Sequence, residues 1–128
     1  MVEIRPRETV ILADDWSTLV EWYVTALGFR ETRRFEDDYH YANLENAAGI
    51  QIGIGDAKEM GITAPDRSQN SVILQFEVEN VADFFAHVTA HGGEVTFGPA
   101  FEEKGKFWFG GFRDPEGNPL WVVDTHCP

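Results

Sequence analysis

The same order of elements occurs twice in this sequence, and this internal repeat restricts the fold more than any other feature. In the first half, an apolar strand at residues 10–13 precedes Asp15, which offers a helix N-cap, and an apolar stripe at helical spacing ends at Gly28. In the second half, Asn80 caps another helix of the same kind, and Gly92 ends it. Strands follow each helix, so the sequence predicts two consecutive β-α-β-β-β modules.

The spacing of these signals predicts how the two modules correspond. Thirteen residues separate the two ends of each helical segment, which we take as 15–28 and 79–92. The two halves are therefore offset by 64 residues, and this offset places Thr9 opposite Ile73. Because each unit is about sixty residues long, an internal duplication explains the pattern.

We expect one α+β domain that covers residues 1–128. Module 1 should occupy about 8–56 and module 2 about 71–125. Residues 57–70 between them contain glycine, proline and small polar residues without apolar periodicity, so we expect a linker there. Each module alone would expose one face of its sheet. We therefore expect two curved sheets around a shared cavity, with the helices covering the outside.

The charge balance restricts the classes of partner. Twenty-two acidic residues against ten basic ones give a formal net charge of −12. This excess argues against nucleic acid and anionic membranes, because both bind basic patches. It is consistent with simple solubility and also with attraction of a cationic ligand. No apolar run approaches the ~20 residues of a membrane-spanning helix, and the single cysteine has no internal partner, so we expect a cytoplasmic protein.

The closing segment Phe112–Asn118 has the sequence Phe-Arg-Asp-Pro-Glu-Gly-Asn, which is typical of a tight turn between two strands. Together with Asp15, the Trp22-Tyr23 pair and the Leu27-Gly28-Phe29 triplet, it resembles the vicinal oxygen chelate superfamily. That group includes glyoxalase I, extradiol dioxygenases, fosfomycin resistance enzymes and bleomycin resistance proteins. The resemblance runs from about residue 10 to 124 and implies the paired-module fold, on which many chemistries occur.

The metal-dependent members of this superfamily carry histidine, glutamate or occasionally glutamine at fixed points on four strands. By spacing, the resemblance places these points on Thr9, Gln51, Ile73 and Trp121. Only Gln51 is a credible ligand, and it is neutral, whereas ions of this class prefer three or four imidazole or carboxylate donors. We therefore expect neither a metal ion nor another cofactor.

Strand alternation extends this set of positions to further side chains on the same face. The predicted ligand-binding residues are Thr9, Tyr39, Tyr41, Gln51, Ile73, Gln75, Phe107, Phe109 and Trp121. Aromatic rings in such a lining can stack on a flat ligand or face a cation, but they can also pack on one another and fill the space. Trp108 has the opposite parity, so we expect it to pack under a helix.

The resemblance is closest in character to bleomycin resistance proteins, which sequester a cationic, aromatic antibiotic as dimers and catalyse no reaction. The acidic-aromatic segment Phe35–Tyr39 resembles a segment at a similar place in them. We therefore expect a homodimer that binds a small molecule, with an aromatic or cationic antibiotic as the candidate ligand. One alternative is a glyoxalase-like lyase or isomerase in which Glu77 is a non-standard catalytic base. Another alternative is a protein that shares the fold and is linked to glyoxalase only by sequence resemblance.

Overall fold

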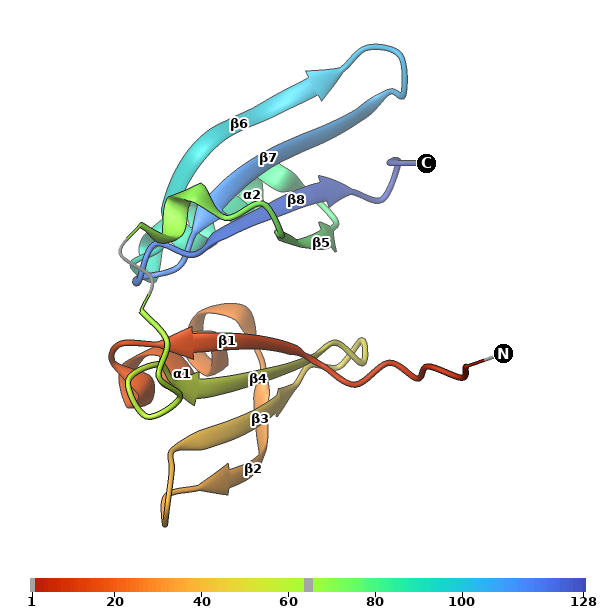
Figure 1. Cartoon of the computed structure of the whole chain (residues 1–128). Coiled ribbons are helices and arrows are strands. Elements are labelled where there is room, and N and C mark those ends of the chain that lie inside the picture. The colour runs from red at the N-terminus through yellow and green to blue at the C-terminus, as the bar shows by residue number, and fades with distance from the viewer. Residues whose placement is uncertain (1, 64–65) are drawn as a thin grey trace. The chain divides into compact units, whose positions relative to one another are not determined.

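The computed structural model describes residues 2–63 and 66–128, which divide into two compact units, Met1–Thr63 and Ala64–Pro128. Each unit contains one four-stranded sheet with one α-helix on one of its faces (Figure 1). The elements of unit 1 are β1 (Thr9–Ala13), α1 (Trp16–Leu27), β2 (Arg30–Phe35), β3 (Tyr41–Glu45) and β4 (Gln51–Asp56). The elements of unit 2 are the short 3-10 helix η1 (Arg67–Gln69), β5 (Leu74–Val78), α2 (Val81–Ala90), β6 (Glu94–Glu102), β7 (Phe107–Arg113) and β8 (Pro119–Asp124). The predicted α+β fold of two tandem βαβββ modules is confirmed, and neither sheet is closed.

The sheet of unit 1 has the strand order β1-β4-β3-β2, with β1 and β4 parallel and the other neighbours antiparallel. The helix α1 contacts β1 and β4 and buries its apolar stripe, which includes Leu19 and Tyr23. Ile52 and Ile54 of β4 are fully buried. Each such large apolar side chain contributes roughly 1.5–3 kcal/mol of burial free energy. The indole of Trp16 also joins helix to sheet, because its Nε1 donates to the Ile54 carbonyl oxygen at 2.7 Å.

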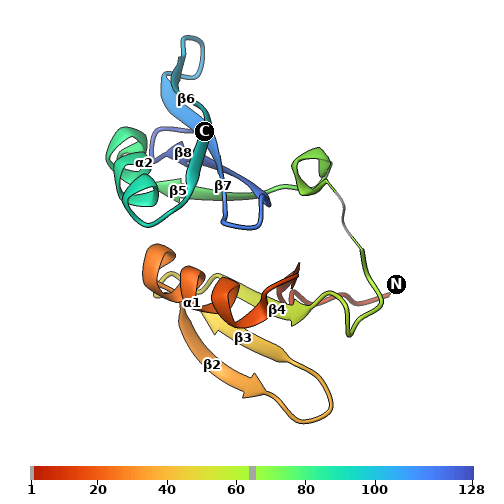
Figure 2. The same ribbon diagram turned by 90° about the vertical axis from the view of Figure 1, so that its left-hand side faces the viewer.

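The sheet of unit 2 repeats this arrangement with the order β5-β8-β7-β6 (Figure 2). Its core is more aromatic than that of unit 1. The ring of Phe112 on β7 is fully buried, with Phe84 at 5.3 Å and Phe85 at 6.4 Å between ring centroids. Leu120 and Val122 of β8 complete the buried face. Because edge-to-face aromatic pairs add to simple area burial, these contacts fix α2 on its sheet.

The helix caps correct the predicted offset between the modules. Asp15 caps α1 and Asn80 caps α2, and each side chain accepts a hydrogen bond from a main-chain amide in the first turn. The two N-caps are 65 residues apart, not 64. Position 73 therefore corresponds to Glu8 and not to Thr9.

The closing turn is held by the side chain of Asp114. Its Oδ1 accepts hydrogen bonds from the main-chain amides of Glu116 and Asn118, both at 3.0 Å, and its Oδ2 accepts from Asn118 Nδ2 at 2.8 Å. Arg67 in η1 donates to Asn118 Oδ1 at 3.3 Å and lies 3.5 Å from Glu116. These contacts align β7 with β8 and join the second part of the predicted linker to unit 2. Residues 64–65 of that linker lie outside the described residues.

The two α-helices are short, with 12 residues in α1 and 10 in α2. A membrane-spanning helix needs ~20 apolar residues. Within residues 2–63 and 66–128, no helix is long and apolar enough to cross a membrane.

Candidate functional site

Each sheet has one face that no helix of its own unit covers, the open face. Side chains alternate between faces along a strand, and paired residues on neighbouring strands share a face. The register assigns to the open face of unit 1 the side chains of Val10, Leu12, Arg30, Arg33, Phe35, Tyr41, Asn43, Glu45 and Gln51. By the same rule, the open face of unit 2 carries Gln75, Glu77, Phe97, Phe107, Phe109, Trp121 and Val123.

Glu8, just before β1, joins the open face of unit 1 through two hydrogen bonds. The Tyr41 hydroxyl donates to Glu8 Oε1 at 2.6 Å, and Asn43 Nδ2 donates to Glu8 Oε2 at 2.9 Å. Both donors stand on β3, so the contacts reach over the intervening strand β4. Gly53 makes this possible, because a Cβ at that position would collide with the Tyr41 hydroxyl and lie 2.6 Å from its ring carbon Cζ. The Glu8–Tyr41–Asn43 network is therefore built into the sheet.

The environment of Tyr41 keeps its phenol protonated. Burial, and then the hydrogen bond to the Glu8 carboxylate, raise the pKa of Tyr41 well above its ordinary value of 10. At neutral pH, Tyr41 is thus a hydrogen-bond donor and not a base. Its role in the network is to hold the Glu8 carboxylate in place on the open face.

Around this network lies a pocket of about 200 Å³. Its lining is polar and contains groups of both charges. The residues that line it are Arg7, Glu8, Thr32, Arg33, Asn43, Leu44, Glu45 and Gln51. Such a lining favours a polar group of a ligand over an apolar ring.

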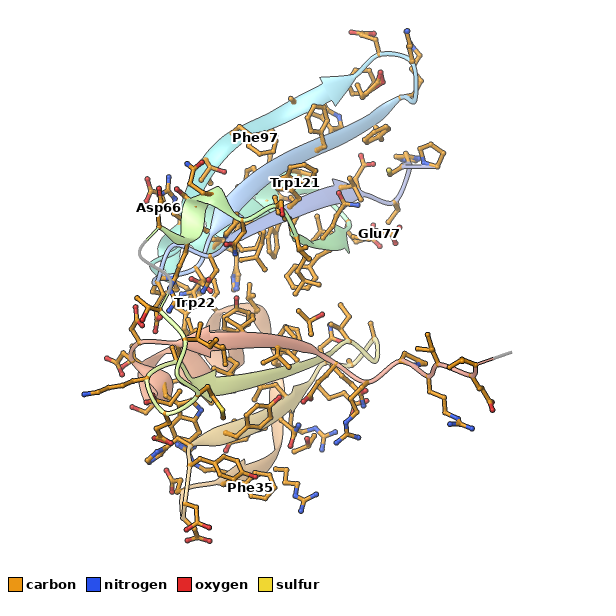
Figure 3. All side chains as sticks on the ribbon, viewed as in Figure 1. Trp22, Phe35, Asp66, Glu77, Phe97 and Trp121 are labelled. Carbon is orange, nitrogen blue, oxygen red and sulfur yellow. The ribbon has the colours of Figure 1, made fainter. Side chains whose placement is uncertain are left out.

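The open face of unit 2 is aromatic where that of unit 1 is polar. Phe97, Phe107, Phe109 and Trp121 form a continuous row, the aromatic cluster. Ring centroids are 6.1 Å apart for Phe97 and Trp121, 6.3 Å for Phe97 and Phe109, and 6.0 Å for Phe107 and Phe109. Phe97 and Trp121 lie close together on this face in Figure 3. Trp121 is 44% exposed and Phe97 41% exposed, so each presents ring surface to solvent within its own unit.

A glycine again permits the close approach. Gly111 on β7 pairs with both Phe97 and Trp121, and a Cβ there would collide with the Phe97 ring, with its Cδ1 only 2.8 Å away. The Phe97 ring therefore lies directly over β7. Polar neighbours adjoin the cluster, because Gln75 pairs with Trp121 across β5 and β8. Glu77, the predicted catalytic candidate, is exposed two residues further along β5.

Several predicted site residues lie on the open faces: Tyr41, Gln51, Gln75, Phe107, Phe109 and Trp121. The structure brings Tyr41 and Gln51 together on the open face of unit 1, and it brings the other four together on the open face of unit 2. That they bind a ligand stays a prediction. Ile73 immediately precedes β5, and Tyr39 precedes β3, where its ring stacks on Phe35 at 5.9 Å.

Two of the predicted side-chain environments are wrong. Thr9 pairs with Ile52, a fully buried residue on the helix-covered face, so its side chain is on the opposite face from Gln51. The one-residue error in the offset explains this, because each step along a strand changes the face. Trp108 is also not covered by a helix. It is 46% exposed and packs on Phe101, 5.2 Å away, at the end of the β6–β7 hairpin.

The residues that the sequence prediction missed are Glu8, Arg7, Arg33 and Phe97. The correct offset of the helix caps would have identified Glu8, since that offset is read from Asn80. Arg33 follows an irregularity in the pairing of β2 with β3, and a bulge changes the face of the residues after it. Phe97 was predicted to be in a strand, but its position over Gly111 depends on the pairing of β6 with β7.

A second hollow of about 530 Å³ lies at the N-terminal end of α1. Four carboxylates line it, together with Trp16, Ser17 and His40: they are Asp14, Asp15, Glu36 and Asp56. The Arg34 guanidinium covers the Trp16 ring at 4.6 Å. His40 bonds to Glu59 through both its Nδ1 and its main-chain amide. These contacts join two of the lining residues, Trp16 and His40, to neighbours outside the lining.

The metal site of the metal-dependent relatives does not fit the residues of this chain. The corrected offset offers Glu8, but both of its oxygens already accept hydrogen bonds from Tyr41 and Asn43. Gln51 is a neutral amide, and Ile73 and Trp121 have no donor atom for a metal. Within residues 2–63 and 66–128, no group of three or more His, Cys, Asp or Glu side chains is arranged to hold a metal ion. The donor set is too small and too neutral for a zinc-type centre.

The sequence and the fold agree on the family. The model of the Glyoxalase/Bleomycin resistance protein/Dioxygenase superfamily matches residues 5–122. The chain belongs to this superfamily. No curated protein matches the sequence significantly.

Solved structures show the same fold at low sequence identity. A superfamily member from Sphaerobacter thermophilus has a TM-score of 0.77 at 19% identity, over 94% of this chain and 98% of that one. The genomically encoded fosfomycin resistance protein FosX from Listeria monocytogenes has a TM-score of 0.76 at 12% identity, over 96% and 94%. TnmS3, an antibiotic binding protein from Streptomyces sp., has a TM-score of 0.73 at 17% identity, over 97% and 98%. At these identities the likeness shows the fold alone.

Proposed function

We propose that this protein is a metal-free small-molecule binding protein whose ligand stacks on the aromatic cluster. The observation that carries the proposal is the exposure of Trp121 and Phe97 side by side on the open face of unit 2. Aromatic surface that is exposed to water contributes no burial free energy, and a flat ligand that covers it would therefore bind favourably. Stacking of such a ligand on one ring is worth roughly 1–3 kcal/mol.

Two of the similar proteins support an antibiotic as the ligand class. FosX is a fosfomycin resistance protein, and TnmS3 is an antibiotic binding protein. The net charge of −12 would attract a cationic compound at a distance and repel nucleic acid and anionic membranes. We further propose that the protein acts as a cytoplasmic homodimer.

A ligand screen with a turnover assay tests the proposal. A panel of bleomycin-like glycopeptides, planar aromatic antibiotics and methylglyoxal–glutathione adducts would be titrated while tryptophan fluorescence is followed. We expect saturable binding of at least one aromatic compound, and recovery of that compound unchanged when mass spectrometry is applied after incubation. Failure of every compound to bind would contradict the proposal.

Turnover that persists with chelators would favour the glyoxalase-like lyase or isomerase instead. In that case Glu77→Gln should abolish the reaction, because Glu77 is the carboxylate exposed near the aromatic cluster on β5. Binding without turnover, unchanged in the Glu77→Gln variant, is the result expected for a binding protein. The two outcomes separate the candidate functions on one set of samples.

A further inference from the structure

We propose that the pocket of unit 1 binds the oxyanion of a small molecule, a carboxylate, phosphonate or phosphate, between Arg7 and Arg33. The inference goes beyond the proposed function, because it concerns a pocket of unit 1 and not the aromatic cluster of unit 2. It starts from the charge inventory of a chain that has 22 acidic and only 10 basic residues. With more than two acids for each base, an arginine of this chain is expected to lie near a carboxylate.

Most arginines do so. Five of them lie within 4.0 Å of a carboxylate oxygen: Arg5, Arg30, Arg34, Arg67 and Arg113. Arg7 and Arg33 are the exceptions among the arginines that the structure describes, and both line the same pocket. Two exposed guanidinium groups with no carboxylate oxygen within 4.0 Å line one hollow of about 200 Å³, where an anion could accept hydrogen bonds from both.

The fold holds one of these cations in position. Arg33 pairs in register with Asn43, which places it on the open face of unit 1. Its guanidinium lies 4.7 Å above the Phe35 ring, a cation–π contact that restrains the side chain without neutralising its charge. The donor fork of an arginine matches two oxygens of a carboxylate or phosphonate, so the restrained Arg33 side chain can offer two donors to such a group.

The remaining lining narrows the chemistry of the ligand further. Thr32 and Gln51 bring neutral hydrogen-bonding groups to the pocket. The carboxylates of Glu8 and Glu45 also line it, and Glu45 lies 3.9 Å from Arg30. A lone anion would be repelled by these two acids. A ligand that carries a hydroxyl or amino group beside its oxyanion would satisfy both the arginines and the acids.

Charge-matched probes test the site. Phenylphosphonate, benzoate, benzamide and benzylammonium would be titrated at millimolar concentration, with the Arg7 and Arg33 Nε–Hε signals and the main-chain amides followed by NMR. We expect phenylphosphonate and benzoate to shift both arginine signals saturably, and benzamide to bind ~10-fold more weakly or not at all. Because the site is partly exposed, affinity should fall as salt rises. Benzylammonium represents the cationic class that the net charge favours.

Substitutions assign the effect to the two arginines. Arg7→Gln and Arg33→Gln should each weaken phenylphosphonate binding by ~10-fold, while Arg33→Lys should retain part of it. Lys58→Gln is the matched control: it removes the same charge from unit 1 at an exposed residue outside the pocket lining, and should leave the affinity unchanged. Thermal unfolding of each variant checks that the fold is intact.

The outcomes distinguish the oxyanion site from the proposed function. Equal binding of benzoate and benzamide, unchanged affinity in both arginine variants, or no shift of either arginine signal would overturn the oxyanion site. An aromatic compound from the panel that quenches tryptophan fluorescence in the same samples would leave the proposed function standing. A phenylphosphonate site that is lost in both arginine variants, without any aromatic compound binding to unit 2, would instead support the pocket and contradict stacking on the cluster.

Discussion

The Tyr41 hydroxyl donates a 2.6 Å hydrogen bond to Glu8, and it does so over Gly53 on the intervening strand. This contact holds a carboxylate on the open face of unit 1. Gly111 has the same role in unit 2, where it leaves room for the ring of Phe97. In both units, one glycine on a central strand lets a larger side chain from a neighbouring strand lie over the sheet.

The raised pKa of Tyr41 predicts a loss of stability at alkaline pH. The unfolded phenol ionises near its ordinary pKa of 10, whereas the folded phenol stays protonated to higher pH. The folded state therefore binds the proton more tightly, and its advantage is present below pH 10 and lost as the pH rises above it. Urea unfolding between pH 8 and pH 11, in steps, should show a steeper decline for the wild type than for Tyr41→Phe. Parallel declines would mean that Tyr41 and Glu8 are not coupled.

Gly53→Ala should destabilise the protein. The added Cβ would meet the Tyr41 ring, so either the ring or β4 must shift, at a cost of about 1–3 kcal/mol. The measurement is the free energy of unfolding, with the double variant Tyr41→Ala/Gly53→Ala as control. In the Tyr41→Ala background, the cost of Gly53→Ala should be much smaller. An equal cost in both backgrounds would show that the collision is not its cause.

Local sequence signals predicted the fold, but they did not determine which residues of the strands face which side of each sheet. Asp15 and Gly28 mark the ends of α1, because capping and a left-handed C-terminal residue are properties of the sequence near each end. The offset was wrong because it was counted from Glu79, one residue before the N-cap Asn80. A shift of one residue changes the face of every side chain on a strand, which is why Thr9 was predicted at the position that Glu8 occupies.

The aromatic half of the candidate site followed from alternation along regular strands, as at Phe107, Phe109 and Trp121. The polar half did not, because Arg33 follows an irregular pair in β2 and Arg7 precedes the first strand. Trp108 shows a further limit of such reasoning. Alternation gave its face, but the exposure of that face depends on how far the β6–β7 hairpin extends past α2.

The donor set predicts that the purified protein retains no stoichiometric zinc, nickel, iron or manganese. Gln51 is neutral, Ile73 and Trp121 donate nothing, and Glu8 is engaged by two hydrogen bonds. The protein would be reconstituted with each metal, dialysed and subjected to elemental analysis. Retention of about one equivalent per chain would contradict the prediction and favour a metal-dependent enzyme.

We expect the protein to be a homodimer. Closed two-fold pairs are the commonest oligomers, and the superfamily resemblance implies a dimer. Sedimentation equilibrium at micromolar concentration should give ~29 kDa, twice the chain mass of 14.5 kDa. A single species of the chain mass at that concentration would refute the expectation.

The affinity ratio between Trp121→Ala and Trp108→Ala tests the central claim most directly. The two side chains are similarly exposed, at 44% and 46%, but only Trp121 belongs to the aromatic cluster. With the tightest aromatic compound of the panel, calorimetry should show a loss of roughly 1–3 kcal/mol for Trp121→Ala, which is ~5- to 150-fold in affinity, and almost none for Trp108→Ala. Trp121→Phe, which keeps a ring, should lie between them. Equal affinities for the two alanine variants would contradict the account.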